Sequence, residues 1–237
     1  MSNWRSQCIE RLLSVPPNPA ALLGELRSIV QELGFDYCSY VLRQPIPLNN
    51  PSMLWSSNYP AEWLRHYEAN NYLAIDPTVQ QAAARAQPVV WDSGSVGPPS
   101  AFWEEARSFG ICHGWTLLTR GPRAATGLLS LARSHEAISA AELDDSELKL
   151  VWLAHQIHGM LDALELQPGV PDGAHQLTER EREVLRWGAD GKTADETGTI
   201  LGITERTVTY HVTLAMCKLG VTNKTQAVAK ALLLKLI

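Results

Sequence analysis

The spacing of apolar residues along the first two thirds of the chain alternates between strand-like and helix-like. Short apolar runs predict strands at 38–42, 53–56, 88–91, 114–119 and 128–132. Apolar residues three or four positions apart predict helices at 4–14, 19–33, 60–70, 77–85, 101–109 and 140–164. Short strands separated by helices favour an α+β domain, an α-β-α sandwich around an antiparallel sheet, which can enclose a cavity.

The last sixty or so residues follow a purely helical pattern, interrupted by single glycines and polar caps. Thr178 and Glu181 form a capping box that opens the first helix, and Gly191 and Gly202 stop successive helices. The expected helices are 178–189, 193–201, 205–219 and 225–236. A helix, a short glycine-containing turn and a second helix form a helix-turn-helix, so this part is predicted to be an all-α, four-helix domain of that type.

A proline- and glycine-rich stretch separates the two patterns. Pro168, Gly169, Pro171 and Gly173 break any helix and leave few groups to pack. We therefore predict a larger domain at 1–165, a linker at 166–176 and a smaller domain at 177–237. The 237 residues are enough for two such domains.

Charge differs between the two predicted domains. Residues 1–174 contain 11 Lys and Arg against 18 Asp and Glu, a net of −7, whereas residues 175–237 contain 9 against 7, a net of +2; together these give the −5 of the chain. A positive module beside an acidic domain is consistent with nucleic-acid binding by the smaller part. Because no apolar run could span a membrane and no secretory signal is present, we expect a cytoplasmic protein without a membrane partner. The four scattered cysteines predict neither disulfides nor a metal site.

The smaller domain resembles the DNA-binding domain of LuxR-type regulators. The resemblance rests on Glu181-x-x-x-Leu185-Arg-Trp, on Gly191-Lys192-Thr193, on Ile203-Thr-Glu-Arg-Thr-Val with His211, and on Lys218-Leu-Gly-Val-x-Asn223-Lys224. In that family the helix that begins near Thr204 enters the major groove. The resemblance therefore implies DNA contacts by Thr204, Glu205, Arg206, Thr209, Tyr210 and Thr213, with Lys192, Lys218 and Lys224 near phosphates.

Several positions of this module have other interpretations or depart from the family pattern. Thr207, Val208 and Val212 are interpreted as core packing rather than DNA contacts. Relatives often carry Lys or Arg in place of Thr209 and Thr213, so the operator sequence does not carry over. Thr197 and Gly198 replace the usual Ile and Ala, and a helical glycine costs about 1 kcal/mol relative to alanine.

Aromatic residues are concentrated in the larger domain, which holds seven of the eight tryptophans. Tyr59, Trp63 and Tyr67 recur every four residues and so form one stripe, and Asp76 follows nine residues after Tyr67. A packed core is the ordinary explanation of such a stripe. A buried carboxylate, however, needs hydrogen-bond donors, which favours a polar site among the aromatic rings.

The larger domain resembles the autoinducer-binding domain of LuxR-type receptors. The shared order includes Asn58-Tyr59-Pro60, Asp76-Pro77-x-Val79, Gly110-x-x-x-Gly114 and Leu129-Ser130-Leu131, with Trp63, Tyr67, Trp91, Phe102 and Trp103 in family positions. The resemblance implies that Trp63 donates to the lactone carbonyl of an N-acyl-homoserine lactone and that Asp76 accepts its amide N–H. It also implies that Tyr59 and Ser130 reach the amide carbonyl, and that Tyr67, Trp91, Phe102 and Trp103 surround the ligand. Asp76 before Pro77 is equally well placed to cap a helix.

The predicted helix 140–164 has an apolar seam of Leu150, Leu153, Ile157, Leu161 and Leu164, close to heptad spacing. One side can cover the sheet while another meets a partner helix. A helix-turn-helix module reads about half a site, so a homodimer on an inverted-repeat, double-stranded DNA operator is expected.

These observations predict a quorum-sensing transcription regulator that requires no cofactor beyond its signal ligand. A ligand-independent LuxR-type regulator is the main alternative. A phosphorylation-controlled response regulator is disfavoured because Lys149 is the only lysine before residue 175, whereas a receiver domain needs a lysine beside its acidic pocket. Catalysis is also disfavoured, because His113, His135, His155 and His158 belong to no nucleophile or metal motif.

Overall fold

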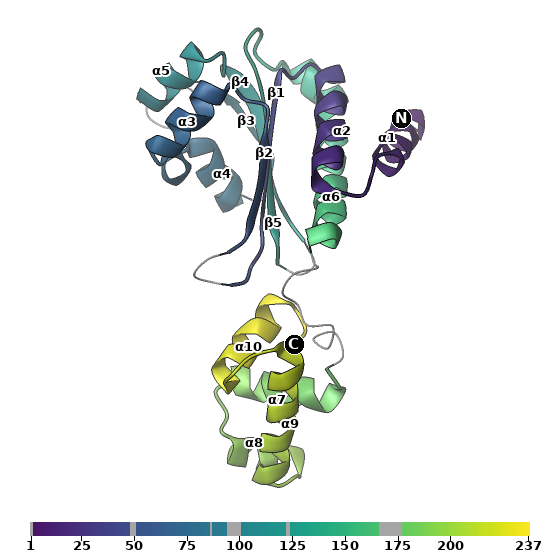
Figure 1. Ribbon diagram of the computed structural model, residues 1–237, viewed down its shortest axis with the longest axis vertical. Coiled ribbons are helices and arrows are strands. Elements are labelled where there is room, and N and C mark those ends of the chain that lie inside the picture. The colour runs from purple at the N-terminus through teal and green to yellow at the C-terminus, as the bar shows by residue number, and fades with distance from the viewer. Residues whose placement is uncertain (1, 48–50, 86, 94–100, 122–123, 166–176) are drawn as a thin grey trace. The chain divides into compact units, whose positions relative to one another are not determined.

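A computed structural model describes residues 2–47, 51–85, 87–93, 101–121, 124–165 and 177–237 (Figure 1). Backbone contacts divide the chain into two compact units, one built on a β-sheet and ending at Leu164, the other containing the C-terminal helices. The predicted linker, residues 166–176, lies outside the described residues. No helix in the described ranges is long and apolar enough to cross a membrane.

The described part of the first unit contains one antiparallel sheet in the strand order β2-β1-β5-β4-β3. Its strands are β1 (Tyr37–Arg43), β2 (Met53–Ser57), β3 (Val89–Asp92), β4 (His113–Arg120) and β5 (Thr126–Arg133). All five predicted strands are therefore confirmed, each within two residues of its expected ends.

Helices cover both faces of this sheet, as the α-β-α prediction required (Figure 1). One face carries α2 (Pro19–Glu32) and α6 (Ala140–Glu165), and α1 (Ser2–Ser14) packs on the outside of these two helices. The other carries α3 (Ala61–Ala69), the short 3-10 helix η1 (Tyr72–Ala74), α4 (Pro77–Arg85) and α5 (Ala101–Ser108).

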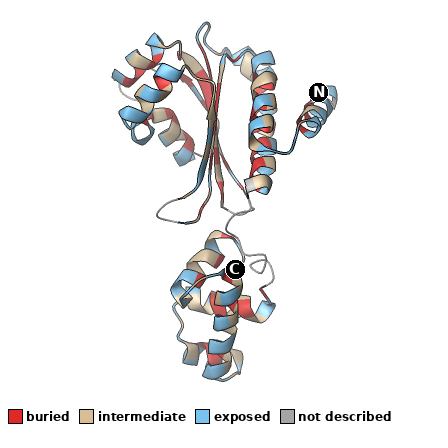
Figure 2. Ribbon diagram, viewed as in Figure 1, coloured by how far each residue is buried: buried red, intermediate tan, exposed pale blue. Residues whose placement is uncertain are grey.

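The period-two alternation of the strands assigns side chains to two separate cores. Buried residues occur in the sheet and in the helices on both sides of it (Figure 2). Tyr40 and Leu42 of β1, with Leu129 of β5, face α2 and α6. The opposite face packs Trp91 and Leu128 against the aromatic residues of α3 and α5. This second, aromatic-rich side contains the candidate ligand site.

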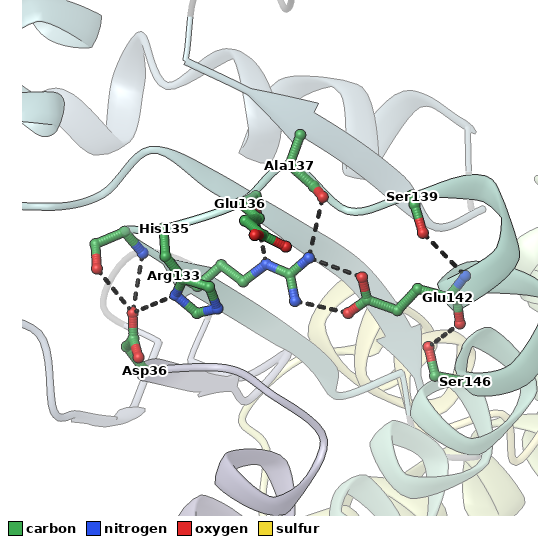
Figure 3. Close-up of polar contacts among 9 residues, drawn as sticks. Asp36, Arg133, His135, Glu136, Ala137, Ser139, Glu142 and Ser146 are labelled. Carbon is green, nitrogen blue, oxygen red and sulfur yellow. Dashed lines mark hydrogen bonds and ion pairs between the residues drawn. The ribbon is translucent and has the colours of Figure 1, made fainter.

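A partly buried ion pair fixes the start of α6 against the sheet (Figure 3). Both terminal nitrogens of Arg133, at the end of β5, donate to the Glu142 carboxylate over 2.6 and 2.7 Å. Arg133 also donates to the carbonyls of Glu136 and Ala137. Arg133 is only 5% exposed, whereas the Glu142 side chain is 31% exposed, so the pair is partly shielded from solvent. The guanidinium lowers the pKa of Glu142.

The apolar seam of α6 packs against the sheet. Leu150, Leu153, Ile157 and Leu161 are completely buried in the core formed with α2 and the strands, and Leu164 packs against that core. Any partner helix would therefore have to contact a different side of α6.

The second unit contains α7 (Glu179–Ala189), α8 (Ala194–Leu201), α9 (Glu205–Leu219) and α10 (Lys224–Leu233). The Thr178 capping box is present, and a second one joins Thr193 to Glu196. The prediction that α10 extends to Leu236 was wrong. The helix ends at Leu233 because the backbone N–H of Leu236 turns back to the Ala231 carbonyl, with Lys235 at a φ of 53°.

Gly198 has a packing reason that its helix propensity does not reveal. A Cβ at this position would lie 2.7 Å from the carbonyl oxygen of Ile203, in the turn between α8 and α9. The glycine therefore allows α8 to approach this turn closely. The neighbouring Thr197 is buried, and its hydroxyl donates to the Thr193 carbonyl over 2.7 Å.

Candidate functional site

A cavity of about 210 Å³ lies between the sheet and the helices α3 to α5. It is mostly apolar and partly open. All eight residues predicted to bind ligand line it, although they come from six different segments of the chain: Tyr59, Trp63, Tyr67, Asp76, Trp91, Phe102, Trp103 and Ser130.

Asp76 is the buried carboxylate of this cavity, with 8% of its surface exposed. Its Oδ1 accepts hydrogen bonds from the backbone N–H and the hydroxyl of Thr78, at 2.8 and 2.7 Å. Its Oδ2 accepts a 2.9 Å hydrogen bond from the hydroxyl of Tyr67. The carboxylate therefore caps α4 through one oxygen and faces the aromatic stripe with the other.

The hydrogen bonds to Asp76 do not fully offset the cost of burying its negative charge. Loss of solvent raises the pKa of this carboxyl, although donation by Thr78, Tyr67 and Val79 opposes the rise. An additional donor would stabilise the ionised form, and Oδ2, with one hydrogen bond, has room for a second.

Aromatic side chains form the walls around this carboxylate. Trp63 is 2% exposed, and its ring packs against those of Tyr67 and Phe102, with centroids 5.7 and 5.9 Å away. No side chain or carbonyl among the described residues accepts the indole N–H of Trp63. This N–H is therefore a donor available to a molecule in the cavity.

Hydroxyl groups form a polar row on the sheet beneath the cavity. The hydroxyl of Ser130 lies 3.0 Å from that of Thr116 and 3.4 Å from that of Tyr59. The indole N–H of Trp91 donates to Thr116 over 3.0 Å. Trp91 thus has its polar atom satisfied by the protein and offers only its ring to a ligand, whereas Tyr59 and Ser130 can hydrogen-bond one.

Sequence reasoning missed several cavity residues, notably Ser39, Val41, Trp55 and Thr78. Ser39 and Val41 lie on β1 between the core residues of the opposite face. The alternation of side chains along the strand could have identified both residues. Successive side chains of a strand point to opposite faces, so every second residue of β1 faces the cavity.

The predicted DNA-contacting residues of the second unit lie at the start of α9 and on one exposed side of it. Thr204 caps the helix through its hydroxyl, which accepts from the Thr207 N–H. Val208 and Val212 are buried against Val184 of α7, as the core-packing interpretation required. Thr207, which was given the same interpretation, is only half-buried, and its hydroxyl lies 2.8 Å from that of Thr204. The residues predicted to reach bases are all exposed: Thr204, Glu205, Arg206, Thr209, Tyr210 and Thr213.

The three lysines predicted near phosphates have different surroundings. Lys192 lies 4.0 Å from Glu196, and Lys224 donates to the Lys192 carbonyl over 2.9 Å. Lys218 is engaged inside the domain, because its ammonium donates to both carboxylate oxygens of Glu181 at 2.8 Å. This gives Lys218 a structural role that the sequence did not indicate.

The Glu181 carboxylate links three parts of the second unit. It is 1% exposed, accepts the Thr178 N–H at the start of α7 and pairs with Lys218 on α9. Burial favours its neutral form, but the hydrogen bonds from Lys218 and Thr178 lower its pKa overall. The stability that this pair contributes is therefore present above the unfolded pKa of a glutamate and is lost as the pH falls through the folded value.

Replacement of Lys218 by methionine should destabilise the second unit by about 2 to 3 kcal/mol. Loss of one partner leaves a buried charge uncompensated, and the partial exposure of Lys218 keeps the cost below that of a fully buried pair. Chemical denaturation of the full chain measures the effect, and Glu181→Gln combined with Lys218→Met should recover part of it. Unchanged stability with weakened DNA binding would instead assign Lys218 to phosphate contact.

Two known protein families match the two units. Residues 18–161 match the autoinducer binding domain family, and residues 175–231 match the luxR family of bacterial regulatory proteins. The transcriptional activator protein SolR of Ralstonia nicotianae is 41% identical over 216 residues, 91% of this chain and 92% of SolR.

Solved structures agree with this assignment. The crystal structure of Escherichia coli SdiA has a TM-score of 0.77 and 32% identity, covering 99% of this chain and 98% of that one; SdiA is also known in complex with octanoyl-rac-glycerol. CepR2 of Burkholderia cenocepacia, described as an N-acylhomoserine lactone dependent LuxR family transcription factor, has a TM-score of 0.61 and 30% identity, covering 68% of this chain and 94% of that one. The chain therefore belongs to the LuxR family of quorum-sensing transcription regulators, with an N-terminal autoinducer-binding domain and a C-terminal helix-turn-helix DNA-binding domain.

Proposed function

We propose that the cavity binds an N-acyl-homoserine lactone and that the bound protein recognises DNA as a homodimer. The ligand proposal rests mainly on the Asp76 carboxylate. It is buried, its hydrogen bonds do not fully offset the cost of burying its charge, and its Oδ2 can accept one further hydrogen bond. A ligand with neither an N–H nor an O–H, such as a simple ester, would not supply that donor.

The remaining polar groups of the cavity match the other polar atoms of an acyl lactone. The free indole N–H of Trp63 suits the lactone carbonyl, and the hydroxyls of Tyr59 and Ser130 suit the amide carbonyl. Phe102, Trp103 and the ring of Trp91 supply apolar walls for the rest. The dependence of the similar protein CepR2 on this ligand class supports the same assignment here.

The exposed residues of α9 support an interaction with DNA in which Arg206, Thr209, Tyr210 and Thr213 meet base edges in the major groove. Lys192 and Lys224, whose ammonium donates to the Lys192 carbonyl, lie close together and supply positive charge for phosphate contacts. A homodimer on an inverted repeat follows from the size of one helix-turn-helix half-site. The protein acts in the cytoplasm by binding, without catalysis, and the match of residues 18–161 to an autoinducer domain leaves no support for a phosphorylated receiver.

Ligand should stabilise the first unit. An empty cavity lined by tryptophan and tyrosine is poorly packed, and a ligand at 100 times its Kd adds about 2.7 kcal/mol to the free energy of unfolding. Thermal denaturation of the full chain with acyl-homoserine lactones of increasing chain length measures this effect. A melting temperature that no member of the series changes would favour a ligand-independent regulator.

Substitution of a lysine near phosphates and substitution of an α9 residue should affect DNA binding in different ways. Lys192→Ala should weaken binding to all sequences alike and reduce the salt dependence, because phosphate contacts do not read sequence. Arg206→Ala should change which operator is preferred. Titration of operator and unrelated duplexes at several salt concentrations separates the two effects, with Lys235→Ala, exposed beyond the last helix, as the control. A shift of sequence preference by Lys192→Ala but not by Arg206→Ala would show that α9 is not the reading helix.

A further inference from the structure

A polar cluster lies behind the aromatic wall of the cavity and joins three segments of the helical side. Glu105 of α5 accepts a hydrogen bond from the hydroxyl of Tyr72 in η1 and a second, over 2.7 Å, from Nε2 of His66 in α3. Because an ionised carboxylate only accepts, both partners donate. None of the three side chains lines the cavity, so any effect of this Glu105 cluster on a ligand passes through other residues.

A reversal of the chain places both donors beside this carboxylate. Asn71, between α3 and η1, adopts the left-handed backbone conformation with a φ of 51°, which asparagine tolerates better than most residues. Tyr72 therefore returns toward α3, and its ring meets that of His66 edge to face, with centroids 5.6 Å apart. The hydroxyl of Tyr72 and Nε2 of His66 thus reach one carboxylate from two different helices.

The hydrogen bonds of the Glu105 cluster favour an ionised carboxylate. Donation by Tyr72 and by His66 lowers the pKa of the Glu105 carboxyl, and the same contact raises the pKa of the Tyr72 phenol to about 12. The phenol therefore stays protonated at neutral pH and donates to a charged acceptor, which gives a stronger bond than one between neutral groups. Tyr72 is buried, whereas the Glu105 side chain is 36% exposed, so we expect a smaller contribution than that of a fully buried cluster.

Trp63 contacts both the Glu105 cluster and the cavity. Its ring packs against those of His66 and Tyr72, with centroids 6.3 and 6.0 Å away, and it also lines the cavity. The segments α3, η1 and α5 are 9, 3 and 8 residues long, and isolated helices of this length are unstable in water. The Glu105 cluster therefore holds together the segments that surround the Trp63 indole.

Resting on the proposed function, we propose that Glu105 is a positioning residue for the signal ligand, because it fixes the Trp63 indole through Tyr72 and His66 in the orientation that donates to the ligand. With the cluster intact, the indole is ordered before the ligand binds, and binding does not have to supply that order. Without it, α5 and η1 shift relative to α3, the hydrogen bond from Trp63 forms in fewer molecules, and the ligand leaves faster.

Exchange of bound ligand measures this effect on the full-length chain. The protein is loaded with a deuterated acyl-homoserine lactone, chosen from a butanoyl to dodecanoyl series as the one that most raises the wild-type melting temperature. Unlabelled ligand is then added in excess, and the remaining labelled ligand is followed by mass spectrometry. Glu105→Gln removes the charge but keeps an acceptor, and Tyr72→Phe removes the hydroxyl but keeps the ring. Each should speed dissociation about threefold to tenfold, part of what one hydrogen bond to a charged group supplies.

The control Glu104→Gln makes the same change of charge at the neighbouring, exposed position of α5 and should leave the dissociation rate unchanged. A double-mutant cycle with Trp63→Phe separates positioning from a general loosening of the domain. Trp63→Phe removes the indole N–H, so Glu105→Gln should have little further effect in that background. The matching N-acyl cyclopentylamide gives a second cycle without a change at Trp63, because it lacks the lactone carbonyl that the indole is proposed to contact. Its dissociation rate should be nearly the same from the wild type and Glu105→Gln.

The possible failures are distinguishable. Wild-type dissociation rates in both Glu105→Gln and Tyr72→Phe would overturn the inference. An acceleration by Glu105→Gln that is equally large in the Trp63→Phe background, or for the cyclopentylamide, would also overturn it, since Glu105 would then stabilise the domain without positioning the indole. A wild type that binds no lactone of the series would contradict the proposed function itself, before any variant is compared.

Discussion

Gly114→Ala is expected to destabilise the N-terminal domain by about 3 kcal/mol or more, at the upper end of overpacking effects. A Cβ at this position would lie 2.2 Å from the Leu131 carbonyl oxygen and 2.2 Å from Cζ2 of Trp91. The tryptophan ring could move, but the carbonyl belongs to β5, which is hydrogen-bonded on both sides. The methyl group would therefore push β4 away from β5 and displace Trp91 from the cavity wall.

Gly159→Ala provides the matched control, because a Cβ at that position of α6 meets no atom within 4 Å. Alanine in a helix interior should leave stability unchanged or raise it by up to about 1 kcal/mol. Denaturation of both variants in the presence of a saturating acyl lactone measures the difference. A Gly114→Ala protein as stable as Gly159→Ala would show that the sheet and Trp91 pack more loosely than described.

Asp76→Asn is expected to weaken ligand binding by about one to two orders of magnitude, while the unliganded domain keeps most of its stability. Asparagine can keep the α4 cap, since its oxygen still accepts from Thr78. It cannot offer a charged oxygen to an amide N–H, and a hydrogen bond to a charged group contributes about 1.5 to 3 kcal/mol.

Thr78→Val controls for indirect effects at this site. It removes the hydroxyl that donates to Asp76 and keeps both the shape of the side chain and the carboxylate. Ligand titration of the two variants should show a much larger loss for Asp76→Asn. Equal losses of ligand affinity in the two variants, or unchanged affinity in Asp76→Asn, would show that Asp76 only caps α4.

Local sequence signals predicted the secondary structure closely. We could predict the helix caps at Thr178 and Thr204 and the alternating strands without knowing any distant contacts, because helix caps and strand faces depend on neighbouring residues. The end of α10 was missed because the chain turns at Lys235, where no glycine or proline marks the stop.

Features that depend on contacts between distant segments were harder to predict. The pairing of Lys218 with Glu181 joins residues 37 positions apart, and the hydroxyl row of Thr116 and Ser130 requires the strand register. The predicted ligand residues line one cavity. Trp91 and Ser130, however, were predicted to contact the ligand because of the family resemblance and not because of their spacing. The role of Gly198 likewise depended on the neighbouring turn.

Native mass spectrometry of the full-length chain, produced with a mixture of acyl-homoserine lactones and acylglycerols, tests directly whether the cavity binds an acyl lactone. We expect a complex whose added mass equals one acyl-homoserine lactone per chain, with loss of that mass in Asp76→Ala. A chain that carries no small molecule, or that carries an acylglycerol in preference to every lactone, would contradict it.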